Sequence, residues 1–537
     1  MQLLKFIKRE SGEPYLQLGV MVVISGVANG LLIAVVNHAV RSLVAGEDLT
    51  SYFLIYMVAF ILFLYTQWYA FDYSIILVEE SLHNFRKRLS QKIKLVELEY
   101  IEKVGIDNLY ARLTQNDTFI TQMVPQITAA AQMFTLLIFS LLYLAYISPL
   151  TFVILITTIV GGVIFFQAQT NLIKKSLEEA KRKEARYFRS IADMIHGFKE
   201  IKINHDKAGA LLQNIDRVTH HAKTMKIEAG RKEARMAGFG RLFVYGLLPL
   251  LVFVIPSLSN ERAADVFRVT AVMLFIIGPI TILVNMIAIV NRLNFVLKEL
   301  DNLEAEMDQA IRQDMLSGDG EEEYFQELIM KNVKFQYPGA GNEFAVGPIS
   351  ESIRRGEVLF IIGSNGSGKS TLLKLLTGLY YPQEGAIYLD NHPISANEYL
   401  SYRNLFSVVF TDFHLFEKLY ASKLPETEMV RQWLKKMQLQ HKVSYQDGAF
   451  TDTDLSTGQR KRLALIAALL EDKPLLVIDE FAADQDPQFR RYFYETLLPE
   501  IKASGKTIIA VTHDDHYFHV ADRILKMEDG KLLPNSI

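Results

Sequence analysis

Long apolar runs separated by polar stretches dominate the first 300 residues. Six runs approach or exceed the roughly 20 residues that an α-helix needs to cross about 30 Å of hydrocarbon. They lie at about residues 16–36, 53–77, 120–147, 150–166, 239–258 and 266–290. Only Ser148 and Pro149 separate the third run from the fourth, which predicts a tight helical hairpin. The pattern favours six membrane-spanning helices over buried helices of a soluble protein.

Charges between the runs predict their orientation. Lys and Arg gather in the N-terminal tail and in the long loops at 79–118 and 172–234, whereas the loops at 41–50 and 259–265 carry few. Because basic residues concentrate in cytoplasmic loops, we expect both termini and both long loops in the cytoplasm. The tail is basic but lacks a short apolar segment ending in a small-residue cleavage site, so no removable signal peptide is expected.

Both long loops have the pattern of helices that continue beyond the membrane. About 20 additional residues would carry a helix roughly 30 Å into the cytoplasm. Each loop is interrupted once, near 103–107 (KVGID) and near 196–198 (HGF). We expect short crosswise helices there, suited to contact a cytoplasmic domain, with a simple turn as the alternative.

Four polar or amphipathic side chains inside the runs are candidates for a substrate cavity. They are Trp68, Asp72, Gln126 and Asn285. Polar groups at membrane depth usually face a bundle interior or a water-filled cavity. They can also join helices to one another through hydrogen bonds. The sequence leaves both readings open.

The pattern changes after residue 300. Residues 301–325 are rich in charge and contain a Gly-Asp-Gly break, which predicts a helix ending in an exposed linker. From 326 to 537, short β-rich runs alternate with helical ones, as in an α/β domain. The expected fold is a polytopic helical membrane domain (1–300), a linker (301–325) and an α/β nucleotide-binding domain (326–537).

A glycine-rich turn in FIIGSNGSGKST predicts an ATP site. An apolar strand precedes it and a helix follows, which is the context of a phosphate-binding P-loop. Glycines allow successive backbone N–H groups to point inward at an anion, and the helix N-terminus favours negative charge. Lys369 can reach the β- and γ-phosphates, and the Ser370 hydroxyl can hold Mg²⁺. The expected ATP contacts are Gly363, Ser364, Asn365, Gly366, Ser367, Gly368, Lys369, Ser370 and Thr371.

Two acidic residues end the buried strand KPLLVIDE far downstream of the P-loop. Asp479 is expected in the Mg²⁺ shell, and Glu480 is expected to orient or deprotonate the attacking water. His513 follows the apolar strand KTIIAVT, where its imidazole could contact the γ-phosphate. A histidine at a strand end is more often structural. A role for His513 is therefore indicated only by its occurrence together with the P-loop and the acidic pair.

Two further stretches could contact ATP. The pentapeptide Leu455–Gln459 precedes an amphipathic helix, so Ser456, with Gly458 and Gln459, could form a second anion site. A plain helix cap is the alternative. Tyr337, in VKFQYP, could stack on adenine, although by itself it would be an ordinary strand aromatic.

The composition limits the classes of binding partner and of chemical site that the chain can have. The formal net charge is −3 over 537 residues, so nothing indicates nucleic acid as a partner. The chain has no cysteine, which excludes disulfides, zinc–thiolate sites and a fused cysteine-peptidase domain. A soluble ATPase acting on ribosomes or DNA is the alternative class, and the six apolar runs argue against it.

Taken together, these motifs resemble the ATP-binding cassette family. GSNGSGKST is similar to its Walker A motif, LSTGQ to its signature, LLVIDE to its Walker B motif, VTH to its switch histidine, and Ala483–Asp486 to its D-loop. Six spans before one cassette resemble a half-size exporter. The resemblance implies a homodimer with two ATP sites, each combining the Walker motifs of one subunit with the signature of the other. It also implies nucleotide contacts for Asp486.

A narrower resemblance concerns cargo. LFSVVFTDFHLF and the stretch from LSTGQRKRLALIAALLEDKPLLVIDE to VTHDDHYF resemble exporters of cyclic peptides and siderophore precursors, including syringomycin, pyoverdine and microcin-related exporters. This implies ATP-driven export of a peptide-type or siderophore-like substrate by alternating access at the bacterial inner membrane, in contact with membrane lipid. A lipid flippase of the same architecture and a nucleotide-sensing regulator are the alternatives.

Two residues depart from the family pattern. Thr411 stands where most cassettes have a Gln that contacts Mg²⁺ and couples the ATP site to the membrane domain. The neighbouring Asp412 is expected to replace that Gln in part, directly or through water. Thr457 replaces a signature glycine, but Ser456 and Gly458 remain, so a working site is expected.

Overall fold

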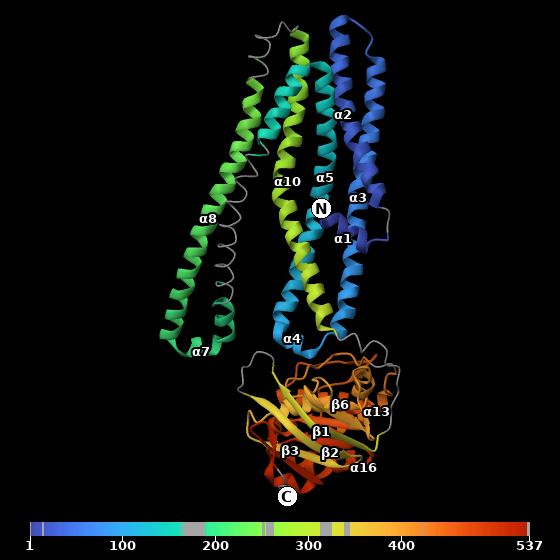
Figure 1. Cartoon of the computed structure of the whole chain (residues 1–537), viewed down its shortest axis with the longest axis vertical. Coiled ribbons are helices and arrows are strands. Elements are labelled where there is room, and N and C mark those ends of the chain that lie inside the picture. Colours follow the sequence, from blue (N-terminus) through green and yellow to red (C-terminus); the bar gives the residue numbers. More distant parts are fainter. Residues whose placement is uncertain are drawn as a thin grey trace. The chain divides into compact units, whose positions relative to one another are not determined.

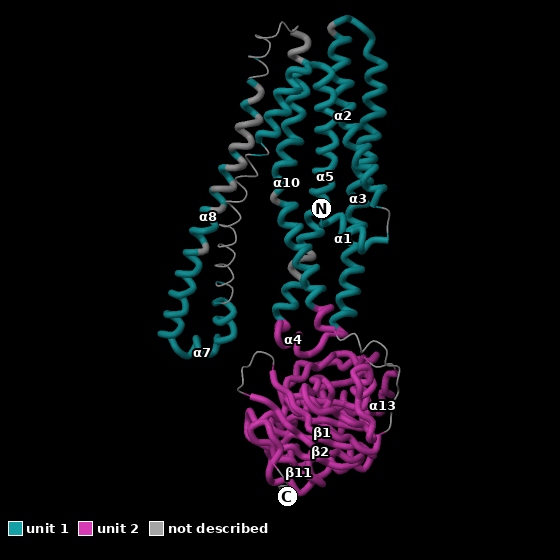
Figure 2. The backbone as a smooth tube through the Cα atoms, viewed as in Figure 1, with its two compact units in different colours: residues 1–93, 107–306 teal, residues 94–106, 307–537 magenta. Residues whose placement is uncertain are grey.

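The computed structural model describes residues 2–12, 15–162, 190–249, 263–311, 325–337, 344–420 and 423–533, with the single residues 164, 187 and 253. The chain divides into two compact units (Figure 2). Unit 1 comprises residues 1–93 and 107–306, and unit 2 comprises 94–106 and 307–537.

Unit 1 is built from long helices. Their bounds are α1 (Gln2–Glu10), α2 (Tyr15–Ala45), α3 (Thr50–Leu95), α5 (Ile106–Ile147), α7 (Phe198–Ile203), α8 (His205–Pro249) and α10 (Ala263–Ala310), and a further apolar helix spans Pro149–Gly162. Figure 1 shows α2, α3, α5 and α10 running alongside one another. A buried apolar cluster joins α2, α5 and α10 around Ile33, Leu144 and Val272.

The described residues contain four helices long and apolar enough to cross a membrane. These helices confirm the first, second, third and sixth expected spans. The fourth expected span begins as the helix Pro149–Gly162, and its remainder lies largely outside the described residues. The fifth begins as the end of α8, and its remainder also lies largely outside them. At 46 residues, α3 is about 69 Å long, so it extends well beyond a bilayer core as expected.

Charged residues join three helices of unit 1. The Arg88 guanidinium on α3 bonds to Glu10 of α1 (2.7 Å) and to Glu304 of α10 (2.6 Å). Lys92 Nζ donates to the same Glu304 carboxylate at 2.8 Å. Glu10 and Glu304 are both buried, and a buried carboxylate must be paired. These pairs fix the ends of α3 and α10 relative to α1.

Unit 2 contains three sheets. The strands are β1 (Glu327–Gln336), β2 (Ala345–Arg354), β3 (Val358–Gly363), β4 (Glu384–Leu389), β5 (His392–Pro393), β6 (Phe406–Val409), β7 (Tyr445–Gln446), β8 (Ala449–Phe450), β9 (Leu475–Asp479), β10 (Thr507–Val511), β11 (Arg523–Glu528) and β12 (Lys531–Leu532). An antiparallel sheet has the order β2-β1-β4-β5, and a second sheet has the order β12-β11-β3-β10-β9-β6. The second sheet is parallel except at β12. Strands β7 and β8 form a separate hairpin.

Unit 2 also contains helices and short turns, most of them between strands. They are α4 (Leu98–Val104), α11 (Lys369–Leu376), α12 (Tyr399–Arg403), α13 (Thr427–Lys436), α14 (Thr457–Leu470), α15 (Pro487–Tyr492) and α16 (Leu498–Ala503), with shorter turns η3 (Ala396–Glu398), η4 (Phe481–Asp484), η5 (Phe493–Leu497) and η6 (Asp515–Val520). Strands β9 and β10 are buried along their whole length. A parallel sheet covered on both faces places its functional residues at the carboxyl ends of its strands. Asp479 and Thr512 mark those ends.

Candidate functional site

The P-loop joins β3 to α11, as expected. Gly363 and Gly368 have positive φ values, +154° and +99°. A Cβ at Gly363 would lie 2.2 Å from the main-chain oxygen of Met527, so a side chain does not fit there. The turn therefore requires glycine for close backbone approach as well as for its torsion angles.

Lys369 lies inside the turn. It is buried, and its Nζ donates to the main-chain oxygens of Gly363 (3.0 Å) and Ser364 (2.9 Å). Six of the nine loop residues expected to contact ATP line a cavity of about 270 Å³, together with Phe344 and Glu480; the six are Asn365, Gly366, Gly368, Lys369, Ser370 and Thr371. A cation, a helix N-terminus and a concave backbone together suit a polyphosphate. Phe344 is a lining residue that sequence reasoning missed.

Ser370 and Asp479 come together next to this cavity. The Ser370 hydroxyl donates to Asp479 Oδ2 at 3.3 Å. Burial raises the pKa of Asp479 above its ordinary value. Two oxygen ligands completed by phosphate oxygens and water suit Mg²⁺, which needs few protein carboxylates. Within the described residues no three acidic, His or Cys side chains cluster as an all-protein metal site.

Glu480 and His513 also come together. His513 Nε2 lies 3.2 Å from Glu480 Oε1. Glu480 has φ +48° and ψ +43°, the left-handed region, and its N–H donates to Val511 O at 3.1 Å. Non-glycine residues in this region often mark functional sites. The structure thus places the expected base and the expected switch histidine next to each other at the edge of the P-loop cavity.

Thr411 approaches the same strand end from β6. Its hydroxyl lies 3.5 Å from the main-chain oxygen of Asp479. The Asp412 side chain is exposed. Thr411 therefore lies beside the candidate metal pair, whereas the compensation expected from Asp412 stays a prediction.

Tyr337 is anchored to the P-loop helix. Its hydroxyl lies 3.0 Å from Thr371 Oγ1. Its ring stands nearly perpendicular to Phe335 (5.3 Å between centroids) and to Tyr380 (5.8 Å). These contacts fix the ring against the P-loop helix, just after the end of β1. Stacking of Tyr337 on adenine stays a prediction.

The signature residues lie at the start of α14. Ser456 precedes the helix, and its N–H donates to Gln459 Oε1 at 3.4 Å. None of the described residues that line the P-loop cavity belongs to this stretch. Asp486 bonds through one carboxylate oxygen to Phe489 N–H (2.9 Å) and through the other to Arg462 (2.7 Å). The signature stretch and the P-loop cavity are therefore separate places in the described part of this chain.

The short helix α4 at the tip of the first cytoplasmic loop belongs to unit 2. Lys374, on the P-loop helix, donates to the Glu102 carboxylate at 2.7 Å, and the Tyr380 hydroxyl donates to the same group. Burial and this acidic partner raise the pKa of Tyr380. At the other end of α4, Tyr381 donates to Glu97 at 2.9 Å. The expected short helix is therefore present, and Glu97 and Glu102 bond it to residues around the P-loop helix.

The four intramembrane candidates are exposed in the single chain. Trp68 is 66% exposed, and Asp72, Gln126 and Asn285 are exposed as well. They do not belong to the buried polar groups of unit 1, such as Gln132. Their exposure disfavours a role in packing within one chain and leaves the cavity reading as a prediction.

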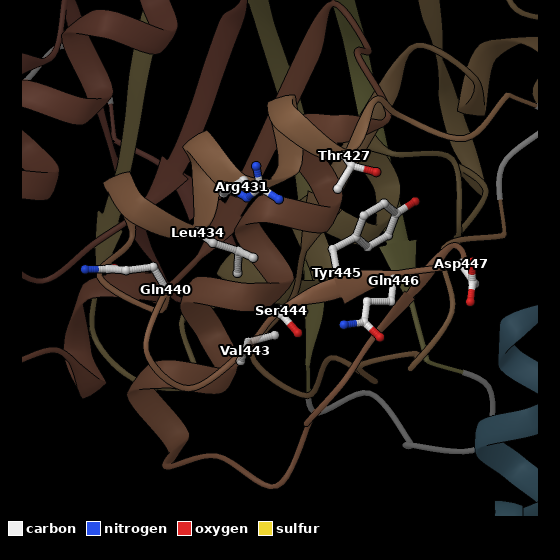
Figure 3. Close-up of a pocket in the computed structure, with 9 residues that line it drawn as sticks. All are labelled: Thr427, Arg431, Leu434, Gln440, Val443, Ser444, Tyr445, Gln446 and Asp447. Atoms are coloured by element: carbon white, nitrogen blue, oxygen red, sulfur yellow. The ribbon is translucent and has the colours of Figure 1, made fainter.

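A second cavity, of about 620 Å³, lies away from the P-loop, between α13 and the hairpin β7–β8 (Figure 3). Polar side chains such as Arg431 and Gln446 line it. The Tyr445 ring belongs to this lining, and burial raises the pKa of its hydroxyl. No sequence motif indicated this cavity, because its lining comes from α13 and the stretch 440–447, which have ordinary composition.

Comparison with known proteins gives the family. A family model for ABC transporters matches residues 346–483. The chain is 34% identical over 476 residues to the ATP-binding protein SyrD of Pseudomonas syringae pv. syringae, covering 83% of this chain and 81% of that protein. It is 24% identical over 506 residues (87% and 81%) to the ATP-dependent lipid A-core flippase of Alkalilimnicola ehrlichii.

A solved structure shows the same fold. It is the structure of a bacterial Atm1-family ABC exporter with ATP bound, and its alignment covers 96% of this chain and 93% of the exporter chain. The TM-score is 0.77 and the sequence identity is 16%. A helical membrane domain joined to a cassette is therefore confirmed as the fold. Because a 34% identical relative spans most of both chains, this chain belongs to the ABC transporter family and is an ATP-hydrolysing membrane transporter.

Proposed function

We propose that this protein is a homodimeric exporter that uses ATP to move a peptide-type substrate out across the bacterial inner membrane. The substrate class is a cyclic peptide, a microcin-like peptide or a siderophore precursor. The observation that carries the proposal is the similarity to SyrD over most of both chains, combined with an ATP half-site that retains its acidic base. Alternating access is the expected mechanism.

The hydrolytic chemistry assigns roles to five side chains. Glu480 orients or deprotonates the attacking water, and His513 beside it contacts the γ-phosphate. Lys369 binds the β- and γ-phosphates. Asp479, with Ser370, would hold Mg²⁺, which when bound neutralises phosphate charge.

A second copy would complete the site. Ser456, Gly458 and Gln459 lie at the N-terminus of α14, and in this proposal they contact ATP held by the P-loop of the partner. Helix α7 supports the same assembly, since it has no buried residue and exposes Phe198 and Ile203. Exposed apolar side chains on a cytoplasmic helix indicate an interaction surface.

Helix α4 would transmit cassette movement to the membrane helices. It is joined covalently to α3 and α5 and is held by Glu97 and Glu102 to residues around the P-loop helix. Thr411 is shorter than the usual Gln, and its hydroxyl lies 3.5 Å from the main-chain oxygen of Asp479. We therefore expect α4 to carry much of the coupling, with a contribution from Asp412.

A lipid flippase is the second candidate. The flippase of A. ehrlichii aligns over 87% of this chain, so the architecture suits lipid as well as peptide. The resemblance of the cassette motifs to exporters of cyclic peptides and siderophore precursors, together with the higher identity to SyrD, favours the peptide class. A nucleotide-sensing regulator would not need the Glu480–His513 pair, which disfavours it.

The proposal includes topology. Both termini and the cassette lie in the cytoplasm, residues 1–300 form the membrane domain, 301–325 the linker and 326–537 the nucleotide-binding domain. The basic residues of the two long loops support this orientation. Lipid surrounds the exposed apolar faces of α2 and α3, and nucleic acid is not a partner.

One experiment separates the cargo classes. The purified protein in lipid vesicles is tested for ATPase stimulation by linear peptides, cyclic peptides, siderophores and lipids. We expect cyclic peptides or siderophore-like peptides to stimulate hydrolysis several-fold and lipids to have little effect. Stimulation by lipid alone would favour the flippase, and no stimulation by any class would favour the regulator.

A further inference from the structure

Lys461 is a buried cation in the second turn of α14. It is 2% exposed, and its Nζ donates to the main-chain oxygen of Glu480 (2.8 Å) and to Asp484 Oδ2 (2.7 Å). A buried ammonium is costly unless it is paired and hydrogen-bonded. Both partners lie outside α14, in the turn that follows β9. The side chain thus joins the signature helix to the residues around the base.

Glu480 is fixed through each of its polar groups. Its N–H donates to Val511 of β10, its carboxylate faces His513, and its carbonyl accepts from Lys461. The left-handed backbone of Glu480 is unfavourable for a residue with a Cβ, so the surroundings must hold it. Lys461 supplies the contact to the carbonyl.

Neighbouring contacts bind α14 closely to the same turn. A Cβ at Gly458 would lie 2.5 Å from the main-chain oxygen of Asp484. Gln485 Nε2 donates to Gly458 O at 3.0 Å, and Arg462 donates to Gln485 Oε1 at 2.7 Å. The start of α14 and the turn at 480–486 therefore form one packed body, which a rotation of α14 would move as a whole.

We propose that Lys461 is a positioning residue for ATP hydrolysis. It holds the main chain of Glu480 so that the carboxylate faces the reacting water. It also ties this base to the helix whose first residues serve the ATP of the partner copy. The orientation of Glu480 at one ATP site then depends on the position of α14 against the ATP at the other site. The inference rests on the proposed role of Glu480.

The first test compares kinetic constants of substituted full-length protein in lipid vesicles. Lys461→Met keeps the length of the side chain and removes the donor, so we expect kcat to fall at least about tenfold while KM for ATP stays within about twofold. Arg460→Met is the matched control, since it removes the same charge from the adjacent exposed position, and it should retain kcat. Unchanged kcat in Lys461→Met would overturn the proposal, as would a rise in KM without loss of kcat.

Lys461→Gln is the second variant and guards against misfolding. The Gln side chain is neutral, but its amide can still donate a hydrogen bond at this buried position. This variant should also lose kcat at unchanged KM, though less than Lys461→Met, with a melting temperature close to the wild-type value. A folded Gln variant with wild-type kcat would contradict the inference.

A double variant distinguishes positioning of the base from damage to the signature. In Lys461→Met/Glu480→Gln, ATP retention should equal that of Glu480→Gln alone, because Lys461 acts through Glu480. Weaker retention would mean that Lys461 serves the signature instead. If Glu480→Gln hydrolyses ATP at the wild-type rate, the assigned base is wrong, which is a separate failure from that of the Lys461 contact.

Discussion

The tips of the two long loops, α4 and α7, differ in how much of their surface contacts other residues of the chain. Helices α4 and α7 are both short and both border a glycine, Gly105 and Gly197. Glu97, which precedes α4, and Glu102 within α4 accept hydrogen bonds from two tyrosines and a lysine of the nucleotide-binding domain. Helix α7 instead leaves Phe198 58% exposed and Ile203 88% exposed.

The difference indicates that the two tips have different partners. Helix α4 uses charge and hydrogen bonds, whereas α7 presents apolar side chains that water solvates poorly. Burying one such side chain is worth about 1.5–3 kcal/mol, so two of them provide a substantial driving force for association. We infer that α4 serves the cassette of its own chain and that α7 serves the cassette of the partner copy.

Glu480→Gln should have the largest effect of the four changes. Its loss of hydrolysis is the reference against which the changes in α7 and α4 are compared. Losing a general base reduces hydrolysis about 10²-fold or more, so the variant should retain ATP without turnover. Steady-state phosphate release and retention of labelled ATP measure the two consequences. Hydrolysis at the wild-type rate would reject Glu480 as the base.

Changing α7 should uncouple transport more strongly than changing α4. Phe198→Asp with Ile203→Asp places charge in the expected apolar interface, so transport should fall at least about tenfold, equivalent to about 1.4 kcal/mol. Lys199→Ala, on the same helix, is the control and should transport normally. Cross-linking between copies at α7 gives an independent measurement, and full transport by the double Asp variant would break the comparison.

Changing α4 should weaken coupling moderately. Glu102→Ala removes the acceptor shared by Lys374 and Tyr380, and a partly exposed ion pair is worth about 0.2–1 kcal/mol. We expect basal hydrolysis to persist while substrate stimulation falls two- to fivefold. Lys103→Ala serves as the control on the same helix. If Glu102→Ala changes basal hydrolysis and leaves stimulation intact, α4 is not the coupling element.

Asp412→Ala should have the smallest effect. Because Asp412 is exposed beside Thr411, its loss should lower both hydrolysis and coupling by about twofold, within the range of a weak metal or water contact. Thr411→Gln should compensate by restoring the longer side chain. Unchanged hydrolysis and coupling in Asp412→Ala would remove Asp412 from the ATP site.

The local structures that the sequence predicted, and that the structure contains, depend on patterns of neighbouring residues. The P-loop turn needs glycine at 363 and 368 for backbone reasons, so its geometry follows from its spacing. The breaks at Gly105 and Gly197 likewise indicated two short helices. Asp479 and Glu480 end a strand, and parallel strands bring their ends together.

Other features depend on contacts between distant segments. Lys461 resembles any basic residue on an amphipathic helix until the turn at 480–486 packs against it. Glu102 and Tyr380 are 278 positions apart, and nothing local links them. The consecutive tyrosines after the P-loop helix were the available signal, since two adjacent aromatic hydroxyls need two acceptors when they pack against another element.

ATP-dependent accumulation of a labelled cyclic peptide in inside-out vesicles tests the central claim most directly. The vesicles contain either the wild-type chain or Glu480→Gln, and labelled lipid is followed in parallel. The account predicts peptide accumulation with ATP in the wild-type vesicles, none with Glu480→Gln, and no ATP-dependent lipid movement. ATP-dependent movement of lipid without peptide accumulation would contradict it.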